Sequence, residues 1–111
     1  MALYLVQLSY TTEAWAALVK NPQDRSEHVG GVVKKLGGKM ENFWLAFGDH
    51  DVIGLVEMPD MTSAAAFSIA LSAGGACKSV KTTPLMSLAD AQQAMKKAAT
   101  SGYKPASAKR K

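Results

Sequence analysis

The segment LYLVQLSY, residues 3–10, constrains the fold most strongly, because it is apolar on both of its faces. A strand with one face in water alternates apolar and polar side chains. Here Leu3 and Leu5 alternate with Tyr4 and Val6, so neither face of the predicted strand is suited to water. The pattern predicts a central strand of a sheet that is covered on both sides.

The second and third predicted strands form a hairpin. They are KMENFWLAF, residues 39–47, and DVIGLVEM, residues 51–58, with the three residues GDH between them. This spacing is typical of two antiparallel strands joined by a short turn. Strict alternation predicts that Met40 and Trp44 share one face of the second strand and that Phe43 lies on the other.

Helical patterns separate these strands. Residues 11–20 predict a helix with a threonine cap, and a second helix follows the break at Asn21-Pro22 and ends at Gly37-Gly38. A third helix is predicted for residues 61–73. The second helix is amphipathic, since its apolar residues recur at helical spacing: Val29, Val32, Val33 and Leu36.

The C-terminal part predicts one more strand and one more helix. Residues 77–86 contain Pro84, which has no N–H to donate and therefore indicates an edge strand. Ser87 begins a capping-box pattern that opens the last helix. One stripe of that helix is apolar and consists of Leu88, Ala91, Met95 and Ala98.

This order of elements predicts an α+β, ferredoxin-like βαββαβ fold with a four-stranded antiparallel sheet and an extra C-terminal helix. Residues 1–100 are predicted to form this single domain, and residues 101–111 a disordered basic tail with little apolar surface. Helices can cover only one face of the sheet. The second apolar face therefore predicts a homodimer that packs sheet against sheet, a dimeric α+β barrel with a small cavity between the sheets.

The chain resembles the GYD domain family. The resemblance rests on YLVQLSYTTEA, LGGKMENFWLAFGDHDVIGLVEMPD and VKTTPLMSLADA, and it covers residues 3 to about 90. Gly48, Asp49 and Asp51 match the turn that gives the family its name, and His50 stands where the family usually has tyrosine. Because the family is similar to dimeric α+β barrels, the resemblance implies this fold and a homodimer, and it implies no particular activity.

Charge and composition limit the partners. The net charge is +4, but residues 1–100 carry nine basic and nine acidic side chains, so the excess lies in the tail. A protein that recognises nucleic acid carries its basic residues on a folded face. Because the excess basic residues lie in the tail, we expect no specific nucleic-acid partner. The N-terminal apolar run is too short for a signal peptide or membrane span, and the lone Cys77 fits a reducing compartment. We therefore expect a cytoplasmic protein without a membrane partner.

The turn Gly48-Asp49-His50-Asp51 has the most reactive groups. An imidazole oriented by a carboxylate is a general base near neutral pH, so His50, Asp49 and Asp51 are the candidate catalytic residues. The alternative is a structural hairpin whose aspartates bond nearby amides. No spaced pair of His or Cys completes a metal site, and no phosphate loop is present, so we expect neither a metal nor a cofactor.

Five other residues are candidates for ligand binding: Trp15, Arg25, Trp44, Gly54 and Thr82. The tryptophans, with Phe43 and Phe47, either line an aromatic pocket or belong to the core. Arg25 is predicted to hold an anionic ligand or to pair with an aspartate of the turn. Gly54 either leaves space above the sheet or marks a bulge, and Thr82 offers a hydroxyl.

Three functions follow as hypotheses. The leading one is a homodimeric α+β barrel that binds a small apolar or aromatic molecule between the sheet and the helices. The second is a cofactor-independent enzyme, monooxygenase- or isomerase-like, that uses His50 with Asp49 or Asp51. The third is a protein interaction module that engages a macromolecule through its dimer face or its basic tail.

Overall fold

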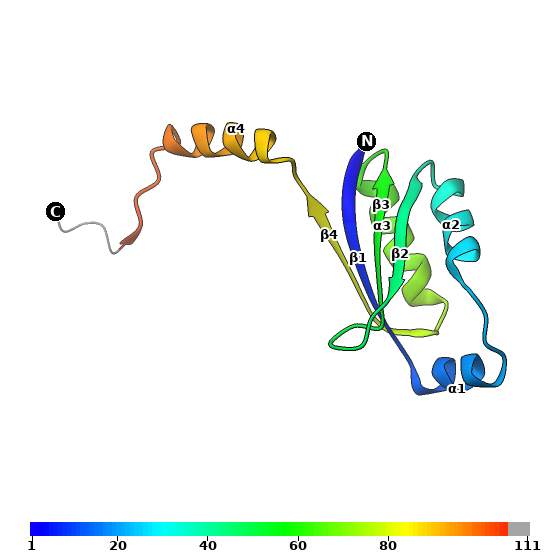
Figure 1. The fold of residues 1–111 in the computed structure, drawn as a ribbon. Helices are drawn as coiled ribbons and strands as arrows, with labels where there is room; N and C mark the ends of the chain where they lie inside the picture. The colour runs from blue at the N-terminus through cyan, green and yellow to red at the C-terminus, as the bar shows by residue number, and fades with distance from the viewer. Residues whose placement is uncertain (107–111) are drawn as a thin grey trace.

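The computed structural model describes residues 1–106. The elements follow one another as β1 (Ala2–Tyr10), α1 (Thr12–Lys20), α2 (Ser26–Lys35), β2 (Lys39–Leu45), β3 (Val52–Met58), α3 (Met61–Ala73), β4 (Cys77–Leu85) and α4 (Leu88–Ala99) (Figure 1). The strands form one sheet in the order β2-β3-β1-β4, and every neighbouring pair is antiparallel. The predicted α+β, ferredoxin-like fold is confirmed, with β1 in the centre of the sheet and β4 at an edge.

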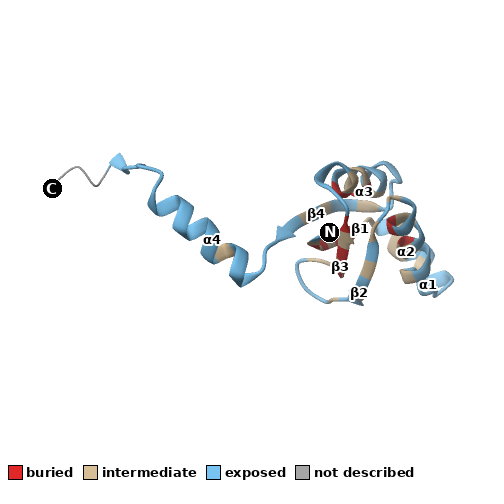
Figure 2. Cartoon of the chain, turned by 90° about the horizontal axis from the view of Figure 1, so that it is seen from above, coloured by how far each residue is buried: buried red, intermediate tan, exposed pale blue. Residues whose placement is uncertain are grey.

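One face of the sheet packs beneath α2 and α3. Alternate residues of β1 and β3 point to this side, and the predicted stripe of α2 meets them through Val29 and Val33. Each such side chain contributes roughly 1.5–3 kcal/mol when it leaves water. The buried apolar core consists of Tyr4, Val6, Leu8, Val29, Val33, Val52, Val56, Met58, Ala64 and Phe67. Figure 2 shows these buried positions concentrated between the sheet and the two helices.

The other face of the sheet has no helix over it in residues 1–106, and we call it the open face. Leu5 lies opposite Leu55 across the β1–β3 ladder, and both are only partly exposed because neighbouring side chains shield them. Ile53 pairs with Trp44 of β2, which keeps 48% of its surface exposed. The open face therefore has an apolar centre on its two central strands, with Gln7 and Glu57 beside it, and remains accessible.

A bulge in β2 corrects one prediction. Met40 pairs with Val56 and Phe43 with Gly54, and the register shifts between Met40 and Asn42. Met40 and Phe43 therefore lie together on the helix side, and Trp44 does not share a face with Met40. The prediction of strict alternation is wrong here because the extra residue of a bulge moves the side chains beyond it to the opposite face.

Gly37 and Gly38 fulfil two different requirements between α2 and β2. Gly37 adopts a φ of 88°, a left-handed conformation that ends α2 and that few other residues tolerate. A Cβ at position 38 would overlap the carbonyl oxygen of Glu57 and lie 2.7 Å from the sulfur of Met58. Gly38 thus allows β2 to begin directly against β3.

α4 projects away from the sheet. Its N-terminus is capped by Ser87, whose hydroxyl accepts the backbone N–H of Asp90 at 3.0 Å, as the capping pattern predicts. Figures 1 and 2 show the helix extending beyond β4, on the side away from α1 and α2, and none of its residues is buried. The radius of gyration is 18.3 Å, whereas a compact chain of this length has about 13 Å. The extra helix is present but adds nothing to the core.

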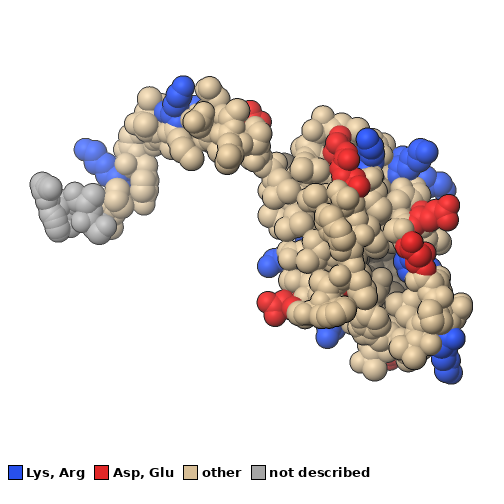
Figure 3. Space-filling model, in the orientation of Figure 1, with Lys and Arg blue, Asp and Glu red and all other residues tan. Residues whose placement is uncertain are grey.

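Three further observations concern the surface, the helices and the tail. Basic and acidic side chains are interspersed on the face of the molecule shown in Figure 3. No helix of residues 1–106 is both long enough and apolar enough to cross a bilayer. Of the predicted basic tail, residues 101–106 are exposed and residues 107–111 lie outside the described part of the chain.

Candidate functional site

Asp51 anchors the turn between β2 and β3 to the end of β1. Its Oδ2 oxygen accepts the backbone N–H of Tyr10 at 2.8 Å and the indole N–H of Trp15 at 3.3 Å. The backbone N–H of Asp51 donates to the carbonyl oxygen of Leu8 at 2.8 Å. These three bonds hold the turn, β1 and the start of α1 together, and the two that end on Oδ2 give the carboxylate a structural task.

His50 is not oriented by either neighbouring carboxylate. In residues 1–106 no hydrogen bond joins its imidazole to Asp49 or Asp51. Asp49 takes part through its backbone, whose carbonyl oxygen accepts the hydroxyl of Ser9 at 3.4 Å. The catalytic roles of His50, Asp49 and Asp51 therefore stay a prediction that this geometry does not support. Nor do three His, Cys, Asp or Glu side chains gather as a metal site anywhere in the described residues.

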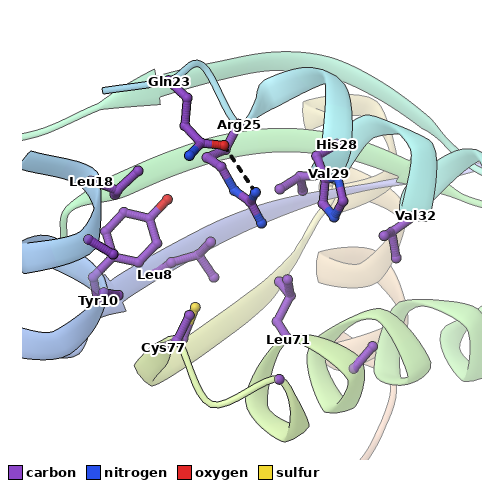
Figure 4. Close-up of a pocket in the computed structure, with 15 residues that line it drawn as sticks. Leu8, Tyr10, Leu18, Gln23, Arg25, His28, Val29, Val32, Leu71 and Cys77 are labelled. Carbon is purple, nitrogen blue, oxygen red and sulfur yellow. Dashed lines mark hydrogen bonds between the residues drawn. The ribbon is translucent and has the colours of Figure 1, made fainter. Parts of the chain in front are cut away.

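A hollow of about 370 Å³ opens between the end of the sheet and the helices α1, α2 and α3, and we call it the main hollow (Figure 4). Leu8 of β1 forms part of its floor, and Leu18, Val29, Val32 and Leu71 form apolar walls. Small-molecule pockets of proteins usually measure about 300–1,000 Å³ and are mostly apolar. In size and lining, the main hollow resembles a site for a small molecule.

Arg25 lies at the mouth of the main hollow. Figure 4 shows its guanidinium directed into the space, and its Nη1 donates to Oε1 of Gln23 at 3.3 Å. The predicted alternative, an ion pair with Asp49 or Asp51, is wrong for the described residues. The positive charge is therefore not neutralised by a carboxylate of residues 1–106. A guanidinium can bind a carboxylate or phosphate with two parallel hydrogen bonds.

Tyr10 and Cys77 add two weak acids to the wall of the main hollow. Burial raises the pKa of the Cys77 thiol. The pKa of the Tyr10 phenol is also raised, first by burial and then by the nearby Cys77, while the charge of Arg25 acts in the opposite direction. Both groups are therefore neutral at pH 7. The phenol can donate a hydrogen bond to a ligand, and the neutral thiol is a weak nucleophile.

A second hollow of about 360 Å³ adjoins the main one, and we call it the side hollow. The two share Tyr10, Leu18, Gln23 and Arg25 in their walls. Arg25 therefore faces two spaces, which meet beneath the connection between α1 and α2. The break between these helices, at Asn21-Pro22, leaves the end of the sheet open at this point.

The side hollow collects three of the four aromatic residues considered above. Trp15 and Phe43 belong to its wall, and Trp44 borders it. Trp15 stands edge-on to Tyr10, with ring centroids 5.3 Å apart and planes at 87°. Phe47 does not join them, because it lies in the β2–β3 turn with 95% of its surface exposed.

Gly54 and Thr82 line neither hollow. A Cβ at position 54 would lie 3.0 Å from the ring of Phe43, so the space above Gly54 is filled by that ring and is not left for a ligand. The bulge lies on the neighbouring strand β2. The hydroxyl of Thr82 forms a hydrogen bond with the hydroxyl of Ser68 on α3. Packing within the domain accounts for both residues.

The sequence reasoning missed the residues that create the main hollow. Their side chains are small, so α1 and α3 cannot fill the space between them. These small residues are visible in the sequence, but no site was predicted from them. The small residues of the lining are Ala14, Ala17, Ala70, Gly74 and Ala76. Tyr10 was also missed, since it was considered only as a strand residue.

The sheet order and the two hollows define a ferredoxin-like α+β protein with an open space between its sheet and its helices. The sequence model of the GYD domain matches residues 4–95, so the chain belongs to the GYD domain family. This match includes the β2–β3 turn with His50 and extends into α4. A comparison with curated proteins gave no match.

Proposed function

We propose that this protein binds a small, largely apolar or aromatic molecule with an anionic group, and that it does so as a homodimer. The observation that supports the binding is the main hollow, with its apolar walls and Arg25 at the mouth. The apolar body of the ligand lies among Leu18, Val32 and Leu71. Its anionic group meets the guanidinium, and the phenol of Tyr10 donates a further hydrogen bond.

The size of the hollow sets the expected affinity. A two-ring aromatic molecule that buries about 200 Å² of apolar surface gains about 5 kcal/mol, and a hydrogen-bonded charge adds roughly 1.5–3 kcal/mol. Part of this gain is lost to the ordering of the ligand. The expected dissociation constant for such a molecule is therefore on the order of 10–1,000 μM.

The open face of the sheet supports the homodimer. Leu5, Leu55 and Ile53 present an apolar surface on the central strands, and Trp44 extends it on β2. Monomeric proteins rarely leave a large apolar patch in contact with water. A second copy that packs its own open face on this one covers both patches with a single two-fold contact.

A titration with two matched probes tests the binding. The probes are 2-naphthoate and its neutral analogue 2-naphthamide, and binding is followed by calorimetry. We expect the wild type to bind the carboxylate at least fivefold more tightly than the amide, and Arg25→Gln to abolish this preference. Lys97→Gln, which removes the same charge from α4 far from the hollow, is expected to leave it unchanged.

A second variant tests the location. Ala70→Leu places a larger side chain in the main hollow and is expected to weaken the binding of both probes at least fivefold. The control Ala89→Leu makes the same change at an exposed position of α4. Equal binding by both leucine variants and the wild type would show that the main hollow is not the site. Native mass spectrometry of the wild type measures the dimer independently of any probe.

A further inference from the structure

The segment that follows β4 exposes apolar side chains that nothing in residues 1–106 covers. We call Met86, Ser87 and α4 together the α4 arm. Met86 is 62% exposed, Leu88 86% and Met95 66%. Leu88 and Met95 lie seven positions apart on one stripe of the helix, and the opposite side carries Lys97 and other polar residues. The arm is therefore amphipathic, and its apolar stripe has no partner within the described chain.

A helix of this length needs a partner to be stable. α4 has 12 residues and no buried side chain, and isolated helices shorter than about 12–15 residues are only marginally stable in water. The Ser87 cap and the alanines favour the helix locally, but they do not account for the exposed Leu88 and Met95. The stripe between those two residues is the surface through which packing stabilises α4.

The chain exposes more surface than a compact protein of its mass. The chain exposes 7859 Å², whereas a compact protein of its mass exposes about 5,900 Å². The difference, about 2,000 Å², comes in part from the projecting α4 arm, and it exceeds the roughly 800 Å² that one partner contributes to an interface of standard size. The exposed surface is therefore large enough for a stable contact.

We propose that the α4 arm packs its Leu88–Met95 stripe against a second copy of this chain, at the margin of the contact between the two open faces. This proposal rests on the homodimer of the proposed function. Only Met86 and Ser87 separate α4 from β4, so the arm leaves the domain directly at the edge of the sheet. Figure 2 shows it extending past this edge and away from the helices that cover the core.

A second copy fits these observations because the chain has both halves of the contact. It carries a projecting helix with an apolar stripe and an uncovered sheet face with an apolar centre. In a two-fold dimer each chain gives its arm to the other, so both arms and both open faces are covered in one closed assembly. Phe47, in the exposed turn at the β2 edge of the sheet, is available for the same contact.

The test compares two full-length double variants with equal charge changes. Leu88→Glu with Met95→Glu puts charges on the apolar stripe. Gln93→Glu with Lys97→Gln makes the same net change on the opposite side of α4. The dimer dissociation constant is measured by sedimentation velocity over a dilution series. We expect the stripe variant to raise this constant at least tenfold and the control variant to change it less than twofold.

Hydrogen exchange gives a second readout, which depends on the arm alone. The amides of α4 are expected to be protected in the wild-type dimer and to exchange freely in the stripe variant. A wild type that stays monomeric at 50 μM would overturn both the homodimer and the arm contact. A wild-type dimer that the stripe variant leaves unchanged, with α4 unprotected, would overturn the arm contact and leave the homodimer standing.

Discussion

The Asp51 carboxylate accepts the indole N–H of Trp15 at 3.3 Å, which connects the β2–β3 turn to the first turns of α1. The same oxygen accepts the N–H of Tyr10, and Tyr10 in turn packs edge-on against Trp15. The turn that carries His50 is thus part of the framework beside the two hollows. The Asp51 carboxylate need not be catalytic to matter, since it fixes the wall that Tyr10 and Trp15 form.

Removal of this carboxylate tests the structural task. We expect Asp51→Ala to lower the free energy of unfolding by about 1–3 kcal/mol, because two N–H donors lose a charged acceptor. Asp49→Ala is the matched control, since only the backbone of Asp49 forms a hydrogen bond in residues 1–106. Its effect is expected to stay within about 0.5 kcal/mol. Urea unfolding followed by tryptophan fluorescence measures both, and equal effects would contradict the anchoring role.

Substitution by alanine is expected to have opposite effects on stability at two glycines, Gly38 and Gly31. Gly38→Ala is expected to destabilise the protein by about 1–3 kcal/mol, because the new methyl group meets the Glu57 carbonyl and the Met58 sulfur. Gly31→Ala adds a methyl group in the middle of α2, where no atom lies within 4 Å. Helix propensity then raises the stability by up to about 1 kcal/mol. Thermal unfolding of the two variants and the wild type measures these effects. A loss of stability in both variants would contradict the open space beside Gly31 in α2.

The sequence was sufficient for the order and type of the elements, because local patterns determine them. Alternating apolar residues predict β1, and the polar residues Thr11, Asp60 and Ser87 cap the helices that follow them. Local patterns did not predict which side chains of β2 point toward the helices. The bulge between Met40 and Asn42 depends on how β2 pairs with β3, which no local pattern of β2 encodes.

The candidate site was predicted less well, because it arises where distant segments meet. Arg25 was identified as a ligand residue, and it does lie at the mouth of a hollow. The space itself depends on small side chains of α1 and α3, such as Ala17 and Ala70. A small residue in a sequence does not show whether a cavity or a neighbouring side chain lies beside it. Gly54 shows the converse, since a glycine that suggested space proved to be covered by the ring of Phe43.

Because Gly54 and Phe43 are in contact, we expect substitutions at the two positions to have coupled effects on stability. Gly54→Ala is expected to cost about 1–3 kcal/mol of stability, because its Cβ would lie 3.0 Å from the Phe43 ring. In a Phe43→Leu background the same change is expected to cost at least about 0.5 kcal/mol less, since residues in contact couple. Chemical unfolding of the four proteins measures this coupling. Strict additivity would mean that the ring does not occupy the space above Gly54.

The buried thiol of Cys77 is expected to make the stability of the protein depend on pH. Burial raises the pKa of Cys77 in the folded protein, so the folded state favours the neutral thiol. The unfolded thiol ionises near pH 8.5. The stability that the neutral thiol contributes is therefore fully present below about pH 8.5, and it is lost as the pH rises through the higher folded pKa. Wild type is expected to lose more stability between pH 7 and pH 9.5 than Cys77→Ala, as measured by urea unfolding.

The same burial predicts slow alkylation of Cys77 and a way to observe the hollow. At pH 8 iodoacetamide is expected to modify the folded protein more slowly than the urea-unfolded chain, because the thiolate is the nucleophile and burial raises the pKa of the folded thiol. Because Cys77 lines the main hollow, 2-naphthoate is expected to slow the reaction further in the wild type. In Arg25→Gln this additional protection is expected to disappear while the slow basal rate persists. Protection that survives in Arg25→Gln would mean that the guanidinium does not hold the carboxylate.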